Sequence, residues 1–243
     1  MRKRRAIAIL LASATALLFL GASLPAAIEQ AFFSKPASTE SVLTDRPAEP
    51  SATVPSDNSQ LAVTVLATLE VKGRAAKTGY ARSEFGDGWS TVNGCTARNI
   101  ILNRDMQEVV LQDECTVVSG VLQDPYTATE IMFTKDKSAA VQIDHVIALS
   151  DAWQKGAQQL TKAQRIQLAN DPLELLAVDG PANQQKSDAD AATWLPKNKN
   201  FRCTYVARQI AVKAKYSLWV TPAEHEAMAK VLSQCPLEPI PSP

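Results

Sequence analysis

The sequence of 243 residues has no excess of charge of either sign, because 25 basic side chains are balanced by 25 acidic ones. Proteins that coat nucleic acid through bulk positive charge have a strong basic excess, so that class is excluded. The sequence also contains no internal repeat. Hydrophobic residues make up 46% and charged residues 21%, and these proportions exclude wholesale disorder and indicate a folded chain with one or two domains.

The common sequence patterns of zinc sites are missing. There is no Cys-x-x-Cys and no His-Glu-x-x-His, and neither of the two histidines lies near a pair of cysteines in the sequence. A zinc site built on the cysteines and a zinc hydrolase of the His-Glu-x-x-His type are therefore disfavoured.

Charge is absent from Ala6 to Ile28, and this run directly follows four basic residues at positions 2–5. A basic head, an apolar middle and a small-residue exit around residues 25–27 predict a secretory signal within residues 1–33. The run is also long enough to span a bilayer, so an uncleaved N-terminal membrane anchor is the alternative. In either case we expect the rest of the chain to be secreted or held at the extracellular face of the cell envelope.

Residues 34–60 contain four prolines and no aromatic residue, which predicts an extended, solvated linker. The folded unit is expected over residues 61–243. Its even number of cysteines in an oxidising compartment favours two disulfides. Of the three pairings that four cysteines allow, we predict Cys95–Cys115 and Cys203–Cys235, because each pair lies within one local segment.

The order of the predicted elements indicates an α+β fold. A glycine-rich stretch around residues 79–94 is expected to form loops, and strand-like runs follow at residues 116–122, 129–134 and 140–149. Capping-box patterns then predict a short helix from Thr161 to Ala169 and a last helix from Thr221 to about Ser233. Between them, one buried helix face is predicted from the spacing of Cys203, Val206, Ala207, Ile210 and Ala214.

The candidate chemistry begins with an Asp144-His145 pair inside the apolar run of residues 141–149. In a regular strand these two side chains would point to opposite faces, so a shared site requires the strand to bend or end there. A histidine in such a run is as often a satisfied core residue. Downstream, residues 170–178 resemble a second strand, Asp179-Gly180 marks a turn, and Asn183 is placed to cap a helix whose first turn presents Lys186.

A strand with Asp-His, a second strand and a helix resemble the ββα-metal finger of HNH endonucleases, here over about residues 140–195. The closer resemblance is to the exported HNH proteins related to the C-terminal domain of GmrSD-type restriction endonucleases. It rests on IDHVIALSDAW (143–153), NDPLELLAVDGPANQQKSD (170–188) and TWLP (193–196), and upstream on GYARSEFGDGW (79–89) and CTARNIILNRD (95–105). In one departure, Thr96 stands directly after Cys95 where the resemblance leads us to expect an acidic residue.

The resemblance implies a metal-dependent nuclease that hydrolyses DNA, and RNA as a further candidate substrate, with low sequence specificity. His145 would be the general base, and Asp144 and Asn183 would bind one divalent cation, Mg²⁺ or Mn²⁺. Asn170 would brace the loop between the strands and orient His145, and Lys186 would hold a phosphate oxygen. The alternatives are a turn residue for Asn170, a helix cap for Asn183 and a solvated lysine for Lys186.

Further contacts with nucleic acid are less specific in the sequence. Arg98 is a candidate phosphate contact, with a salt bridge inside the first disulfide loop as its alternative. Between residues 191 and 223 there are six basic residues and no acidic one, which predicts a local basic face or, alternatively, a solvated helix face. The competing function is a non-catalytic envelope protein that uses the same scaffold for binding. We expect a monomer in either case.

Overall fold

The computed structural model describes residues 61–241 and begins with the short helix α1 (Ala62–Leu66). The predicted signal or anchor, residues 1–33, and the predicted linker, residues 34–60, lie outside the described residues. Within residues 61–241, no helix is both long enough and apolar enough to cross a membrane.

The strands form small antiparallel sheets. β3 (Gln107–Leu111), β4 (Val117–Gln123) and β5 (Glu130–Thr134) make one sheet in that order, and β1 (Thr91–Val92) pairs with β2 (Cys95–Thr96). β6 (Val141–His145) pairs with β7 (Leu175–Asp179), and their register runs from Val141 opposite Asp179 to His145 opposite Leu175. The chain between them forms α3 (Leu149–Gln154), η4 (Ala157–Gln159) and α4 (Lys162–Ala169).

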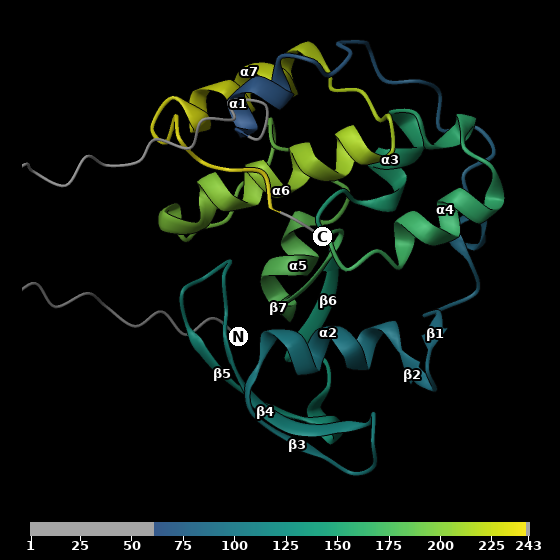
Figure 1. The fold of residues 1–243 in the computed structure, drawn as a ribbon, viewed down its shortest axis with the longest axis vertical. Coiled ribbons are helices and arrows are strands. Elements are labelled where there is room, and N and C mark those ends of the chain that lie inside the picture. Colours follow the sequence, from purple (N-terminus) through teal and green to yellow (C-terminus); the bar gives the residue numbers. More distant parts are fainter. Residues whose placement is uncertain (1–60, 242–243) are drawn as a thin grey trace, which may run out of the picture. The chain divides into compact units, whose positions relative to one another are not determined.

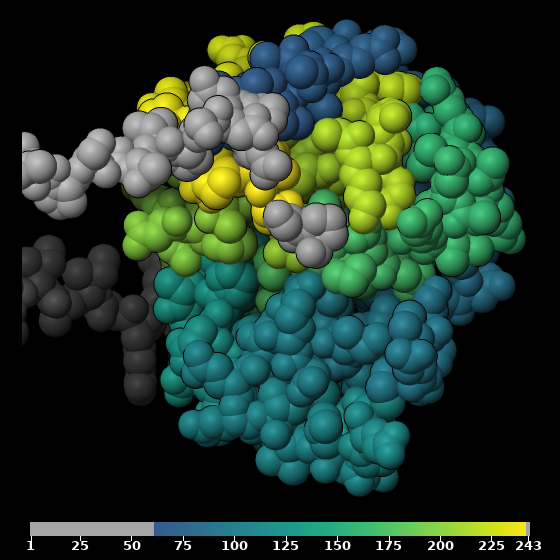
Figure 2. Space-filling view, in the orientation of Figure 1, coloured from purple at the N-terminus to yellow at the C-terminus, as the bar shows by residue number. Residues whose placement is uncertain are grey.

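The remaining helices surround the β6–β7 pair. Figure 1 shows α1, α6 (Arg202–Lys215) and α7 (Pro222–Leu232) together on one side, and α2 (Ala97–Asp105) between the pair and the β3–β4–β5 sheet. α5 (Gly180–Lys186) follows β7 directly, and single turns form η2 (Arg82–Phe85), η3 (Lys135–Lys137) and η5 (Lys199–Phe201). In Figure 2 the teal region of α2 and β3–β5 occupies the lower part of the face shown, below the green helices.

Two hydrophobic cores lie on the two faces of the β6–β7 pair. Alternate residues of β7 contribute to different cores, Leu176 and Val178 to the helical one and Leu175 and Ala177 to the one formed with α2 and the three-stranded sheet. Side chains alternate across a strand, so a strand that is apolar at every position can be buried on both faces. The β6–β7 pair is consequently held between two packed layers, which gives the residues at its end a rigid support.

The mixed helix and strand fold is as the sequence predicts, and the two capping boxes and both disulfides are confirmed. Thr161 and Thr221 both form complete capping boxes, with Gln164 and Glu224 respectively, at the starts of α4 and α7. Both disulfides form as predicted, Cys95–Cys115 and Cys203–Cys235. Glu238 lies near the second pair, but cysteines in a disulfide have no thiolate to offer a metal.

Several expected boundaries were wrong. The strand predicted over residues 140–149 ends at His145, because its pairing with β7 ends there and α3 begins at Leu149. α2 and β3 were not predicted; Thr96 caps α2 by accepting a hydrogen bond from the Asn99 amide. The buried face of α6 includes Val206, Ala207 and Ile210 but not Ala214, which is exposed near the end of the helix.

Candidate active site

Asp144 and His145 are the last two residues of β6, at the point where its pairing with β7 ends. Both line one cavity of about 530 Å³, which Asn183 of α5 also lines. The end of the strand at this position is the condition that a shared site required. Asp144 and His145 of β6 and Asn183 of α5 therefore line the same cavity.

The imidazole of His145 is fixed in one orientation and one tautomer. Its Nε2 lies 2.9 Å from the carbonyl oxygen of Ala169, and because a carbonyl oxygen only accepts hydrogen bonds, Nε2 carries the ring proton. The indole of Trp89 stacks on the ring, with centroids 5.7 Å apart and planes inclined by 6°. Nδ1 thus carries the lone pair, and it has no hydrogen-bond partner among residues 61–241.

The surroundings of His145 keep it neutral. The pKa of His145 is lowered from 6.5 to about 3, chiefly by burial and also by the positive charges of Arg82 and Lys186, while the hydrogen bond to Ala169 acts to raise it. A neutral imidazole with a free Nδ1 is the form that can accept a proton.

The Asp144 carboxylate is buried and held at both oxygens. Tyr126 donates its hydroxyl to Oδ2 at 2.5 Å, and Lys186 donates to Oδ1 at 2.9 Å. The pKa of Asp144 is raised, because the effect of burial outweighs the opposing effects of Lys186 and Tyr126. A carboxylate oxygen has two lone pairs, so each oxygen of Asp144 retains one acceptor position.

Lys186 is 1% exposed, so its ammonium group is not available to solvent or to a ligand in the cavity. Its ammonium donates to Asp144 and, at 2.8 Å, to the backbone carbonyl of His145. The expected phosphate contact is therefore not available in this arrangement. The alternative of a solvated helix lysine is also wrong, because the side chain is buried and holds the last two residues of β6 against α5.

Asn183 lies inside α5 and does not cap it. The N-cap is Asp179, whose carboxylate accepts from the Ala182 amide, and the turn at Gly180 starts the helix earlier than expected. The Asn183 side-chain amide donates to Oε1 of Gln142 at 2.9 Å. Its Oδ1 has no hydrogen-bond partner within residues 61–241 and remains available on the side chain that lines the cavity.

The donor set of this cavity fits a divalent cation. It combines a carboxylate with spare acceptor positions, Asp144, and the amide oxygen of Asn183, which has no partner in the described part of the chain. Such oxygen donors suit Mg²⁺ and Mn²⁺, which are commonly held by only one or two protein side chains and keep several water ligands.

Asn170, at the end of α4, and Glu174, directly before β7, support the site. Asn170 accepts from the Ser90 amide at 2.8 Å and donates to the carbonyl of Ile166, so it fixes the segment of Trp89. The loop after His145 is braced by Glu174 instead, which accepts from the amides of Ile147 at 3.2 Å and Val146 at 2.9 Å. Glu174 was not predicted as a site residue, although an acidic residue directly before an apolar strand, buried as Glu174 is, is rare enough to signal a role.

The family model of GmrSD restriction endonucleases, C-terminal domain, matches residues 98–231. The chain belongs to this family. A relative from Arthroderma benhamiae, described as an uncharacterized secreted protein, is 35% identical over 181 residues, covering 73% of this chain and 86% of the relative.

The match to the GmrSD C-terminal domain family contains Asp144, His145, Asn170, Asn183 and Lys186, and it begins at Arg98. Arg98 lines the large cavity and donates to the carbonyl of Val141 at 3.2 Å. The salt bridge weighed as its alternative is absent among residues 61–241.

The basic block of residues 191–223 is largely used inside this GmrSD-family fold. Lys213 is fully buried and pairs with Glu224 at 3.0 Å, and Lys215 pairs with Asp171 at 2.6 Å. Arg208 donates to three backbone carbonyls around β7, and Arg202 donates to that of Pro196. The expectation of a local basic face is therefore wrong for most of the block; Lys197 and Lys199 are exposed.

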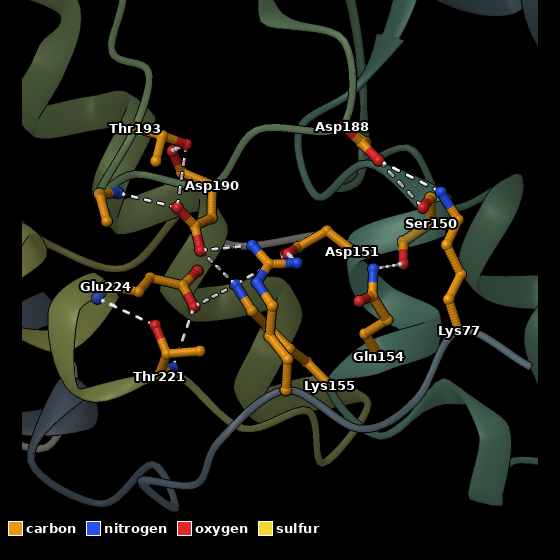
Figure 3. A network of polar contacts seen from close by, with 12 residues as sticks. Lys77, Ser150, Asp151, Gln154, Lys155, Asp188, Asp190, Thr193, Thr221 and Glu224 are labelled. Carbon is orange, nitrogen blue, oxygen red and sulfur yellow. Dashed lines mark hydrogen bonds and ion pairs between the residues drawn. The ribbon is translucent and has the colours of Figure 1, made fainter.

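A buried network of charges supports the opposite end of α3. Lys155 contacts three carboxylates, Asp151 at 2.8 Å, Asp190 at 2.7 Å and Glu224 at 2.6 Å. Figure 3 shows these carboxylates converging on Lys155 from α3, α7 and the segment after α5. The family fold thus ties α3, which follows the Asp-His pair, to the chain that leaves α5.

Proposed function

We propose that this protein is an exported, metal-dependent nuclease that hydrolyses phosphodiester bonds in DNA, and in RNA where that is offered. The proposal is carried by His145, whose neutral ring has a free Nδ1 beside Asp144 and Asn183 in one cavity. Membership of a restriction-endonuclease domain family supports nucleic acid as the substrate. The two disulfides and the secreted relative support export. We propose that β6, β7 and α5 form a ββα-metal finger.

The protein's own residues account for the proton transfer. Nδ1 of His145 accepts a proton from a water molecule, and the hydroxide that results attacks the phosphorus atom. The bond from phosphorus to the 3′ oxygen breaks, and the leaving oxygen takes a proton from solvent water. The Nε2–Ala169 hydrogen bond and the Trp89 stack hold the ring so that Nδ1 keeps its direction. As the ring becomes cationic, the Ala169 carbonyl stabilises the proton on Nε2.

A divalent cation held by Asp144 and Asn183 would neutralise charge on the phosphate and on the leaving 3′ oxygen. Lys186 and Tyr126 fix the Asp144 carboxylate in place for this role. Glu174 accepts a hydrogen bond from the Ile147 amide and so holds the loop after His145 in place beside the site.

Plasmid cleavage tests the proposal. The purified protein is incubated with supercoiled plasmid and Mg²⁺ or Mn²⁺, with an EDTA control, and a single-stranded RNA is tested in parallel. We expect nicking and linearisation that require the metal and are lost in His145→Ala. The matched control is His225→Ala, which changes the second histidine, on α7.

Cleavage that continues unchanged in His145→Ala would sink the mechanism. Absence of cleavage with either metal, in a protein that binds DNA, would favour the non-catalytic binding protein.

A further inference from the structure

The proposed reaction needs a side chain that holds the negative phosphate, and the residues expected to do so are already occupied. Lys186 is buried between Asp144 and the His145 carbonyl. Most of the basic block of residues 191–223 is paired with carboxylates or backbone carbonyls. The positive charge that holds the phosphate must therefore come from other side chains that line the cavity.

Arg82 is the first candidate. It is exposed, it lines both the large cavity and a neighbouring one of about 190 Å³, and His145 lines both as well. Its side chain makes no ion pair or hydrogen bond with any residue between 61 and 241. Its backbone, in contrast, belongs to η2, which is held by buried Phe85 and by the Glu84–Arg165 ion pair at 2.6 Å. A free guanidinium on a fixed turn thus stands beside the proposed base.

Arg98 reaches the same cavity from α2. Its half-buried side chain donates one N–H to the carbonyl of Val141. Within the described residues, no carboxylate pairs with the Arg98 guanidinium. Burial lowers the pKa of Arg98, as expected for a guanidinium without a counter-ion. Its remaining N–H groups are left for a ligand, since a guanidinium has five.

The charge balance of the lining favours an anion. The lining holds two carboxylates, Asp144 and Asp188, and each has a lysine nearby, Lys186 at 2.9 Å and Lys77 at 3.4 Å. Arg82 and Arg98 have no such partner among residues 61–241. The planar guanidinium matches the oxygens of a phosphate, with which it forms two parallel hydrogen bonds.

We infer that Arg82 and Arg98 together form the phosphate-binding subsite, which holds the scissile phosphodiester in front of His145 while Lys186 has a structural role. This inference rests on the proposed function and names the residues that bind its substrate. Arg82 lies before the matched family segment, residues 98–231, and η2 places it at the site.

The test combines DNA binding with cleavage. Fluorescence anisotropy measures the Kd of Arg82→Ala and Arg98→Ala for a duplex oligonucleotide in EDTA, over a range of salt concentrations, and plasmid cleavage in Mg²⁺ or Mn²⁺ gives KM and kcat. We expect each variant to weaken binding about tenfold, the loss of one charge-assisted contact. The slope of log affinity against log salt should fall by about 0.9 for each arginine removed. Arg82→Lys and Arg98→Lys should recover part of the affinity, because lysine keeps the charge without the paired hydrogen bonds.

The matched controls are Lys162→Ala and Lys230→Ala, which remove exposed positive charges on α4 and α7. If the wild-type protein cleaves DNA and both arginine variants behave like these controls in Kd, salt slope and KM, the inference is overturned while the proposed function stands. If the arginine variants lose affinity but no protein cleaves with either metal, the subsite stands and the proposed hydrolysis fails. If Arg98→Ala is unfolded by circular dichroism, Arg82→Ala and Arg98→Lys decide the outcome.

Discussion

Lys186 donates a hydrogen bond to Oδ1 of Asp144 at 2.9 Å, and both side chains are buried. The same ammonium donates to the backbone carbonyl of His145. One side chain from α5 therefore neutralises the proposed metal ligand and fixes the main chain of the proposed base. Asn183 lies one turn earlier on α5, where its side-chain amide donates to Gln142.

Replacement of Lys186 by alanine should destabilise the protein by about 3–5 kcal/mol, because it leaves a buried carboxylate without its counter-ion. Urea unfolding followed by circular dichroism measures this loss. Lys230→Ala, an exposed control on α7, should change the free energy of unfolding by less than about 0.5 kcal/mol. A Lys186→Ala protein as stable as this control would show that Asp144 is not charged in the folded protein.

Replacement of Trp89 by alanine should lower kcat about tenfold or more with little change in KM, since it frees the His145 ring to leave its reactive orientation. Trp89→Phe keeps an aromatic face and should retain most of the activity. Initial rates of plasmid cleavage at saturating DNA give kcat, and a thermal unfolding curve establishes that each variant is folded. An unchanged kcat in Trp89→Ala would mean that Ala169 alone orients the ring.

The buried carboxyl group of Glu174 should make the stability of the folded protein depend on pH. It is fully buried, forms no ion pair with residues 61–241, and burial raises its pKa well above 4.5. Above about pH 4.5, the carboxyl group of Glu174 has lost its proton in the unfolded chain but keeps it in the folded protein. The free energy of unfolding therefore falls by about 1.4 kcal/mol for each pH unit between the two pKa values.

Glu174→Gln removes this dependence while keeping an acceptor for the Ile147 amide. We expect the variant to be more stable than the wild-type protein at about pH 7 and to approach it in stability at about pH 4. Glu226→Gln, an exposed change on α7, serves as the control. A difference that grows as the pH falls would contradict the raised pKa.

The sequence predicts those parts of the fold that depend on local patterns of residues. The capping boxes at Thr161 and Thr221 depend on residues three apart, and each disulfide joins cysteines within one segment of the chain; all four are confirmed. The approach of Asp144, His145 and Asn183 to one cavity was predictable only as the implication of a family resemblance. Their spacing alone left open whether β6 ends at His145.

Contacts across the fold could not be derived from local patterns. Lys186 reads as a surface lysine because α5 is short and polar, and only the packing of α5 on β6 buries it beside Asp144. Tyr126 and Trp89 reach Asp144 and His145 from distant segments. The basic face predicted from residues 191–223 was wrong for the same reason. The acids that neutralise Lys213 and Lys215 are Glu224 and Asp171, which lie outside that stretch of sequence.

The two disulfides should affect stability alike but activity differently. Cys95–Cys115 closes a separation of 20 residues and Cys203–Cys235 one of 32, so serine replacement of either pair should cost roughly 3–4 kcal/mol. Cys95, however, lies three residues before Arg98, at the start of α2, whereas Cys203 and Cys235 join α6 to the end of α7. Loss of the first disulfide should therefore raise KM for DNA several-fold, and loss of the second should leave KM unchanged, in cleavage assays at a temperature where both variants are folded. An equal KM in the two variants would show that α2 holds Arg98 in place without help from the disulfide.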